Sequence, residues 1–482
     1  MGQLTKKDIV SLFLKKGILL SPEKIKELTK ENTKEISQYL IKKEREPPFL
    51  KQEIKNKKKK EQGQKQQNIV NIISSFVETP EKKKVQDFID NFNSRYNFLK
   101  GLLQNRPEIL NTVSIRRIKE RKTKEEAAII GMVVDKKKTK SNNLLFILED
   151  QTGTINILIN QNKKELYSLA ENIMLDEVIG VKGTSSENII FVTNIVLPDI
   201  LPHKLKKTNE EAYAIFLSDI HIGSKQFLTK NFNKFLDWVG GITGNTQQKE
   251  IAKKVKYIFI AGDLVDGIGI YPNQENELEL TDIKDQYIRC VELLKKIPNE
   301  IEIIISPGNH DAVRVAEPQP TPYKEFANPL YELPNVTLVS NPSLVNIHST
   351  PTFPGFDVLM YHGYSFDYFI ANVDGIRLNG GYNRADLVMK YLLQRRHLAP
   401  TFTSTPIIPS KEDPLLIKSV PDIFVTGHIH YCVVSSYKNV SLISGSCWQG
   451  LTSFQEKMGH KPEPARVPII NLKTREMKIL RF

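Results

Sequence analysis

Residues 421–432 read PDIFVTGHIHYC, an apolar run that ends on a glycine and two histidines. If 422–426 form a β-strand, the imidazoles of His428 and His430 leave the end of that strand on one side, because side chains two residues apart share a face. Such a pair occurs where histidines cap a strand and bond to the backbone, and also where two imidazoles act as ligands. Taken alone, the stretch leaves both interpretations open.

The same arrangement recurs in four earlier apolar runs. They are AYAIFLSDIHIG, ending on Asp219 and His221; KYIFIAGDLVDG, on Asp263 and Asp266; EIEIIISPGNHD, on Asn309, His310 and Asp311; and FDVLMYHG, on His362. Helical stretches separate these runs, which predicts an α/β domain over 206–482. Ligand sites of α/β sheets lie at the carboxyl ends of the strands, and five of the nine histidines fall there. The capping interpretation therefore loses its support.

Carboxylates, imidazoles and an amide without thiolates suit Mn²⁺, Zn²⁺ or Fe²⁺ rather than a structural zinc ion. The candidate ligands are too many for one ion and fit two: Asp219, His221, Asp263, Asn309, His362, His428 and His430. Two ions clamp an in-line displacement at phosphorus, and Asp263 is the expected bridge. Asp266 and Asp311 are expected to orient histidines from behind, with surface carboxylates as the alternative.

The N-terminal part of the chain has a different composition. Residues 1–45 predict a small helical unit, with Ser21 as N-cap and Pro22 at the first helical position. Residues 46–82 predict a flexible basic linker, since a lysine and glutamine tract cannot bury a core. Residues 1–60 hold 17 Lys and Arg against 8 Asp and Glu. This excess fits either a nucleic-acid partner or a solvated tail.

Residues 83–205 predict a helix over about 83–105 followed by an OB-fold barrel. Five short strands with one helix between the third and the fourth are typical of that barrel. OB folds bind single strands or serve as packing modules. Because these strands carry no dense aromatic platform, packing is the expected role. The predicted fold class is therefore multi-domain α/β.

Length and composition limit the class of protein. A chain of 482 residues with a net charge of +13 is expected to hold about three domains. No apolar run approaches the roughly 20 residues that span a bilayer, and the N-terminus lacks a signal-peptide core. Cys290, Cys432 and Cys447 form no CxxC pair. A reduced, intracellular protein with no membrane partner is expected.

The ordered set DIH, GDLVD, GNHD, YHG and GHIH resembles the calcineurin-like metallophosphoesterase superfamily. The resemblance implies a four-layer α/β/β/α domain with two divalent ions, Mn²⁺ being expected and Fe²⁺, Zn²⁺ or Mg²⁺ the alternatives. His310 matches the residue with which those enzymes stabilise the transition state or protonate the leaving oxygen. The ligands implied are, at one ion, Asp219, His221, Asp263 and His430, and at the other, Asp263, Asn309, His362 and His428.

The order of domains, with stretches such as LEDQTG, SPGNHD, YLLQRRHLAP and PARVPIINLKT, is similar to that of the small subunits of archaeal family D DNA polymerases. The resemblance covers about 85–482. It implies a proofreading 3′–5′ exonuclease that uses two metal ions, in an archaeal cytoplasm at the nucleoid. The implied partners are a large catalytic subunit, single-stranded or frayed DNA 3′ ends, and a sliding clamp within the holoenzyme.

Two alternatives stay open. One is a non-catalytic scaffold subunit, as in eukaryotic relatives that have lost metal ligands; the filled ligand positions argue against it. The other is a repair nuclease or phosphatase of the same superfamily, and the OB barrel argues against a small-molecule phosphatase.

The stretch MKYLLQRRHLAP, residues 389–400, carries Lys390, Arg395 and Arg396 ahead of a proline-rich loop. These cations are predicted either to guide DNA phosphates or to form a solvated helix face. The histidines outside the motifs are expected to be structural: His203, His348, His397 and His460.

Overall fold

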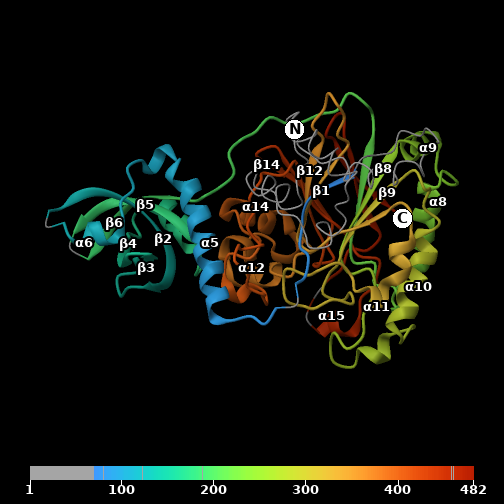
Figure 1. Ribbon diagram of the computed structural model, residues 1–482, viewed down its shortest axis with the longest axis horizontal. Helices are drawn as coiled ribbons and strands as arrows, with labels where there is room; N and C mark the ends of the chain where they lie inside the picture. Colours follow the sequence, from blue (N-terminus) through green and yellow to red (C-terminus); the bar gives the residue numbers. More distant parts are fainter. Residues whose placement is uncertain (1–69, 80, 122, 187, 458, 460) are drawn as a thin grey trace, which may run out of the picture. The chain divides into compact units, whose positions relative to one another are not determined.

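The computed structural model describes residues 70–482 except 80, 122, 187, 458 and 460. The predicted helical unit over 1–45, and the predicted linker up to residue 69, lie outside the described residues. Residues 68–482 cluster into one unit. It contains a helix with a barrel, and two six-stranded sheets with their covering helices (Figure 1).

The barrel confirms the predicted OB fold. Its strands close in the order β2-β3-β4-β6-β5, and α7 lies between the third and fourth strands along the chain. Interior side chains such as Phe146, Ile157 and Val181 are fully buried, because alternate residues of each strand face the barrel axis. The elements are β2 (Glu125–Lys138), β3 (Leu144–Asp150), β4 (Gly153–Ile159), α7 (Lys164–Glu171), β5 (Val178–Ser186) and β6 (Ile189–Val196).

The helix predicted over about 83–105 is α5 (Val85–Gln104), and it packs on the barrel. Tyr96, Leu99 and Leu103 of α5 are buried against Ile130 and Val178 of the barrel wall. The Tyr96 hydroxyl donates to the carbonyl of Ile130 at 3.1 Å, so this polar atom is satisfied within an apolar contact. Short turns, η1 (Pro107–Ile109) and α6 (Ile115–Lys119), connect the helix to β2.

Two sheets stack face to face in the second domain. One has the order β10-β9-β8-β7-β16-β17 and the other the order β1-β11-β12-β13-β15-β14. The strands of the first are β7 (Tyr213–Leu217), β8 (Val255–Ala261), β9 (Glu302–Ser306), β10 (Val336–Leu338), β16 (Arg466–Asn471) and β17 (Met477–Arg481). Those of the second are β1 (Val70–Ser75), β11 (Ser343–Ile347), β12 (Phe356–Met360), β13 (Ile423–Thr426), β14 (Val433–Tyr437) and β15 (Val440–Ser444).

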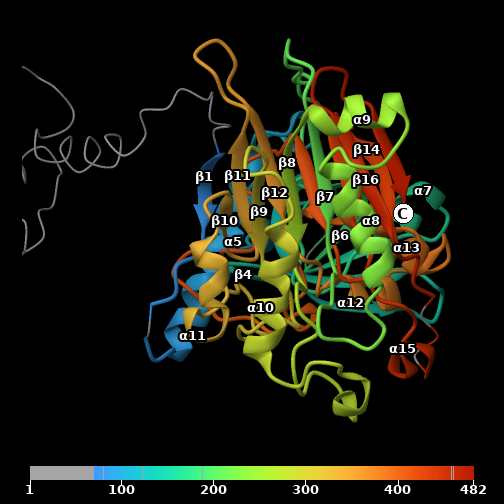
Figure 2. The same cartoon turned by 90° about the vertical axis from the view of Figure 1, so that its right-hand side faces the viewer.

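Helices cover the outer face of each sheet, which completes the α/β/β/α layers (Figures 1 and 2). The first sheet carries α8 (Thr229–Val239), α9 (Thr246–Lys253), α10 (Ile283–Leu294) and α11 (Lys324–Ala327). The second carries α12 (Phe366–Asn372), α13 (Asp374–Arg377) and α14 (Ala385–Arg395). Among the described residues, no helix has the length and hydropathy to cross a membrane.

Strand β7 shows how one sequence serves two cores. Ala214 and Phe216 face the core between the sheets, whereas Ile215 and Leu217 face the helices. Both faces of a central strand are therefore apolar, as expected for a sheet that is covered on both sides. The polar residues are left for the loops at the strand ends.

Strand β1 corrects the predicted domain boundaries. Residues 70–75, assigned to the flexible linker over 46–82, pair antiparallel with β11, from Val70 opposite Ile347 to Ser75 opposite Ser343. The linker prediction is wrong for this stretch because VNIISS is apolar and β-branched, unlike the lysine and glutamine tract before it. Val70 packs against the core between the sheets, so the domain that contains the two sheets begins before the barrel.

Candidate metal centre

The candidate ligands follow the carboxyl ends of five strands from both sheets. Strands β7, β8 and β9 are parallel neighbours in one sheet, and β12 and β13 are parallel neighbours in the other. Their following loops therefore meet at one end of the sandwich. The sequence predicted this meeting point, and the structure brings all seven predicted ligands to it in two adjacent groups.

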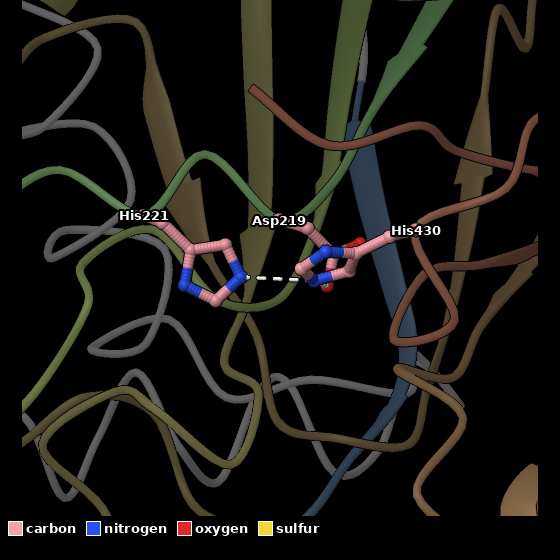
Figure 3. Close-up of side chains that lie close together, drawn as sticks. All are labelled: Asp219, His221 and His430. Atoms are coloured by element: carbon pink, nitrogen blue, oxygen red, sulfur yellow. Dashed lines mark hydrogen bonds and ion pairs between the residues drawn. The ribbon is translucent and has the colours of Figure 1, made fainter. Parts of the chain in front are cut away.

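The first group consists of Asp219, His221 and His430, all buried. Figure 3 shows the ring nitrogens of His221 and His430 facing each other, with Asp219 beside His430. The two Nε2 atoms are 3.1 Å apart, and His430 Nε2 lies 3.4 Å from Asp219 Oδ1. Two imidazoles and a carboxylate at this spacing are arranged as ligands that share one ion.

The second group consists of Asp263, His362 and His428, joined by Asn309. His362 Nε2 lies 3.2 Å from Asp263 Oδ2 and 3.1 Å from Asn309 Oδ1. The same Asp263 oxygen is 4.0 Å from His221 Nε2 of the first group. Asp263 therefore lies between the two groups, where a bridging carboxylate is needed.

The imidazoles are held so that one ring nitrogen is left for the site. His362 Nδ1 donates to the Ala261 carbonyl at 2.8 Å, and His428 Nε2 contacts Asp367 Oδ2 at 2.9 Å. His221 Nδ1 lies 3.1 Å from Asp266 Oδ1. Oxygen partners of this kind set the tautomer and ring orientation of metal-ligating histidines.

Backbone strain is concentrated at the same residues. A positive φ, between 51° and 73°, is found at five of the seven candidates: Asp219, His221, Asp263, His428 and His430. Residues other than glycine occupy this left-handed region at a cost of roughly 1–3 kcal/mol each, and such residues cluster at functional sites. The strain is tolerated here because it directs the side chains of tight loops toward one another.

At two positions in the motifs, only glycine leaves enough space for a neighbouring carboxylate. A methyl group at Gly308 would overlap the Asp263 carboxylate, and one at Gly427 would meet the Asp219 carboxylate and Ser218. Any larger residue would push these carboxylates out of place. The glycines of PGNHD and TGHIH thus make room for ligands that other motifs supply.

Asp266 and Asp311 were both expected to orient histidines, and among the described residues only Asp266 contacts one. Asp266 lies beside His221 as predicted. Asp311 is buried, so it is no surface carboxylate, yet its hydrogen bonds go to the Leu264 and Gly308 amides and to the Tyr287 hydroxyl. The prediction that it orients an imidazole is therefore wrong within the described part of the chain. Asp311 instead ties the loops after β8 and β9 together.

His310 lies at the edge of both groups. Its backbone amide donates to Asp263 Oδ1 at 2.8 Å, and its ring Nδ1 donates to the Asp266 carbonyl at 2.8 Å. The ring stands 4.7 Å from that of His221, centre to centre, and it lines a cavity that also contains Asn309. The bond to Nδ1 leaves Nε2 as the nitrogen that can exchange a proton with a bound molecule.

Two side chains at the site were not found from the sequence. Asp367 contacts His428 and lies in the first turn of α12. Gln455, from the short helix α15 (Ser453–Lys457), hydrogen-bonds His430 Nδ1 at 3.1 Å. Both come from helices outside the histidine motifs, so their distance in sequence hid the contact.

The basic stretch before the proline-rich loop is not the surface that was predicted. Arg395 is buried and pairs with Glu177 of the barrel at 3.1 Å, and Arg396 is buried and donates to the carbonyls of Ile417 and Lys418. The prediction of DNA contact is wrong for both arginines, because neither can reach a phosphate. Lys390 is exposed, with its ammonium 5.3 Å from the Tyr437 ring centre, and its contact with DNA stays a prediction.

The histidines outside the motifs lie away from the candidate metal centre where they are described. His397 is buried against Asp413 at 3.0 Å, and His348 lies next to Tyr257. His203 is half-buried, and His460 lies outside the described residues. None of the three described histidines belongs to a cluster that could hold a metal ion.

Comparison with known families agrees with both domains. The calcineurin-like phosphoesterase family matches residues 214–432, and the OB-fold nucleic acid binding domain matches residues 127–194. Fold and site together define a metallophosphoesterase joined to an OB-fold domain. Curated relatives make the class narrower: the chain belongs to the family of the archaeal DNA polymerase II small subunits.

Three relatives of that name illustrate the match. The protein of Methanothermobacter thermautotrophicus is 40% identical over 400 residues, covering 83% of this chain and 80% of the relative. That of Thermoplasma acidophilum is 31% identical, covering 100% of this chain and 94% of the relative. That of Pyrococcus horikoshii is 37% identical over 83% of this chain, which spans only 63% of that longer relative.

Proposed function

We propose that this chain is a proofreading subunit that hydrolyses the terminal phosphodiester of DNA 3′ ends and so releases nucleotides. One observation carries the proposal: seven candidate ligands are in place and form two groups that meet at Asp263. A phosphodiester displacement with two metal ions needs this arrangement. A non-catalytic scaffold would not need five strained ligand residues at one point.

The electrostatics of the site support a doubly charged ion. Burial opposes the charged form of His362, but the adjoining Asp263 carboxylate raises the pKa of His362 to about 10. Burial lowers the pKa of His221, which is thereby kept as the neutral imidazole that metals bind. Buried carboxylates that are stabilised by positive charge, beside the neutral imidazole of His221, fit Mn²⁺, our first choice, or Fe²⁺ and Zn²⁺.

Each residue has a separate task in the proposed reaction. Asp219, His221 and His430 would hold one ion; Asn309, His362 and His428 would hold the other; Asp263 would contact both. The ions, when bound, supply Lewis-acid stabilisation of the charge that develops on phosphate oxygens. His310, with Nδ1 held by the Asp266 carbonyl, would donate a proton from Nε2 to the leaving 3′ oxygen or stabilise the phosphate charge.

The partners follow from the family. The relatives are named as small subunits of a polymerase, so a large catalytic subunit is the proposed partner of this chain. The barrel and the adjoining phosphoesterase surface are its proposed docking region. A sliding clamp within the holoenzyme stays a prediction.

The experiment compares the wild type with Asp263→Ala. We expect the wild type to bind two Mn²⁺ per chain and to release nucleotides from a 3′-labelled oligonucleotide, and a chelator to abolish release. Asp263→Ala should lose metal and activity together, because the bridge is removed. Asp374→Ala, at an exposed carboxylate of α13, is the matched control and should behave as the wild type.

Other outcomes decide between the alternatives. A wild type that binds no metal and releases nothing supports the scaffold. Faster hydrolysis of free nucleotides or phosphopeptides than of DNA 3′ ends supports another enzyme of the superfamily. An active Asp263→Ala would contradict the two-metal site itself.

A further inference from the structure

Apolar side chains gather at the mouth of the candidate metal centre. A cavity of about 510 Å³ is lined by Asp263, Asn309 and His310 together with Tyr271 and Phe454. The loop that carries Ile270 and the segment that leads into α15 with Phe454 form part of this lining, the rim, and both side chains are partly exposed, Ile270 at 37% and Phe454 at 39%. Apolar surface grouped beside a polar site indicates contact with a ligand that has apolar faces.

Two rings of this rim are already parallel. Tyr271 and Phe454 stack with their centres 4.9 Å apart and their planes 20° from each other. The Tyr271 ring lies 6.4 Å from that of His310. Next to the second ligand group, Tyr364 lies 5.5 Å from His428. Aromatic rings therefore lie next to His310 and His428, two of the residues proposed to act at the phosphate.

Hydrogen bonds tie the rim to Asp266, which lies beside the candidate ligand His221. Gln274 accepts from the Ile270 amide at 2.9 Å and donates to the Asp266 carbonyl at 2.8 Å. The Tyr271 hydroxyl donates to Glu277 at 3.4 Å, and Glu277 also accepts from the Ser453 amide at 3.2 Å. Both loops are therefore held in position relative to Asp266, the carboxylate that lies beside His221.

The side chains that line the cavity favour contact with bases through aromatic rings rather than contact with phosphates through cations. Among the described residues that line it, none is Lys or Arg, so no side-chain ammonium or guanidinium is available to bind a DNA backbone there. Burial, and then the charge of Asp266, raises the pKa of Tyr271. Its ring therefore stays a neutral phenol, which an anionic strand does not repel.

We propose that Tyr271 and Phe454 form a stacking platform for the unpaired bases at a DNA 3′ end, so that the site selects single-stranded ends over paired ones. The inference rests on the proposed function. A base within a duplex has its faces covered by neighbouring pairs, whereas a frayed base offers a free face to an aromatic ring. The platform thereby links mismatch to cleavage without reading the base identity.

The test uses the full chain with Mn²⁺ and three ends of the same sequence: single-stranded, fully paired, and single-stranded with abasic terminal nucleotides. Phe454→Ala and Tyr271→Leu should raise KM for the single-stranded end about tenfold, since one base–aromatic stack is worth that order. Neither variant should change KM for the abasic end or the metal content. Tyr271→Phe, which keeps the ring, should behave as the wild type.

The control is Ile242→Ala, which removes an apolar side chain that is 68% exposed between α8 and α9, outside the lining of the cavity, and should change nothing. An equal rise in KM for normal and abasic ends in Phe454→Ala and Tyr271→Leu, or no rise for either end, would overturn the proposed platform. Affinity for each oligonucleotide is measured by anisotropy beside the release of nucleotides. An inactive wild type would overturn the proposed function. The affinities would still test the stacking platform, because base-dependent binding that Phe454→Ala weakens supports it.

Discussion

His310 follows Asn309 directly, yet the two side chains have different surroundings. Asn309 Oδ1 faces His362, whereas the His310 ring is anchored to the Asp266 carbonyl. His310 also lies close enough to His221 and Asp266 to count as a third potential ligand cluster. Its role as a proton donor and its role as a ligand therefore predict different results on substitution.

We expect His310→Ala to keep both metal ions and its affinity for DNA, and to lose turnover by 10²–10⁴-fold, about 3–5 kcal/mol in the activation barrier. The reason is that a positioned acid or charge donor acts only in the transition state. Metal content and exonuclease rate are measured on one preparation. Loss of an ion together with activity would make His310 a ligand instead.

His397, outside the metal centre, is kept neutral by its hydrogen bonds and its burial. His397 Nδ1 accepts from the Ala399 amide at 2.9 Å, so Nε2 carries the proton that is donated to Asp413 at 3.0 Å. Asp413 is in turn paired with Arg95 at 2.7 Å. Burial, and then the charge of Arg95, lowers the pKa of His397 to about 4.

This neutral histidine predicts a pH dependence of stability. The unfolded chain takes up a proton on His397 near pH 6.5, but the folded chain does so only near pH 4. Between these values the unfolded state binds more protons, so the free energy of unfolding falls as the pH is lowered, by about 3 kcal/mol at pH 4. Denaturant titrations of the wild type and His397→Asn measure it.

The variant should be less stable at pH 7, and the gap to the wild type should narrow toward pH 4. A gap of constant size would show that folded His397 is protonated too.

Residues whose environment is set by their own motif could be predicted, and residues whose environment is set by another domain could not. Asp219 and His428 belong to loops that the strand pattern and the glycines identify. Arg395, in contrast, is paired with Glu177, 218 positions earlier in the chain. Its burial depends on how barrel and phosphoesterase pack, which no local pattern records.

At the scale of elements, periodicity identified the barrel and the helix before it, because each of their strands shows its own alternation. The edge strand β1 was missed, since a run of six residues after a charged tract has no second signal. Its partner β11 lies about 270 residues further on. Beyond the ladder, Phe76 donates its amide to Ser340 Oγ at 2.7 Å.

The strand can be tested by two truncations. Deleting residues 1–67 should leave the fold and the metal centre intact, because no candidate ligand lies there and residues 68–482 cluster into a unit of their own. Deleting 1–76 should lower the melting temperature by roughly 5 °C or more, since it removes the pairing of β1 with β11 and the packing of Val70 against the core between the sheets. It should also promote self-association through the exposed edge of β11.

Thermal unfolding and size-exclusion chromatography compare the two truncated chains. Equal stability of both would mean that β1 contributes nothing to the fold.

For the molecule as a whole, two buried ion pairs join the barrel and its helix to the phosphoesterase domain. Arg395 and Glu177 have side chains only 4% and 0% exposed; those of Arg95 and Asp413 are 1% and 2% exposed. Removing one partner of such a pair leaves an uncompensated buried charge. The orientation of the two domains therefore depends on a few side chains.

We expect Arg395→Met to destabilise the chain by about 3–5 kcal/mol and to separate the unfolding of the barrel from that of the phosphoesterase. The double variant with Glu177→Gln should regain part of the loss, because the unpaired charge is gone. Lys138→Met, in an exposed pair with Glu171, should cost less than about 1 kcal/mol. Calorimetry measures all three, and a single unchanged transition in Arg395→Met would contradict the coupling.

The place of β1 has a consequence for how the chain is connected. Strand β1 precedes the barrel and β7 follows it, yet both belong to the phosphoesterase sandwich. In topological terms the barrel is an insertion, tethered to one host domain at both of its ends. A protease that cuts only one connection, within 76–84 or within 197–212, would leave two fragments that stay associated. The barrel would remain joined to the host domain through the uncut connection.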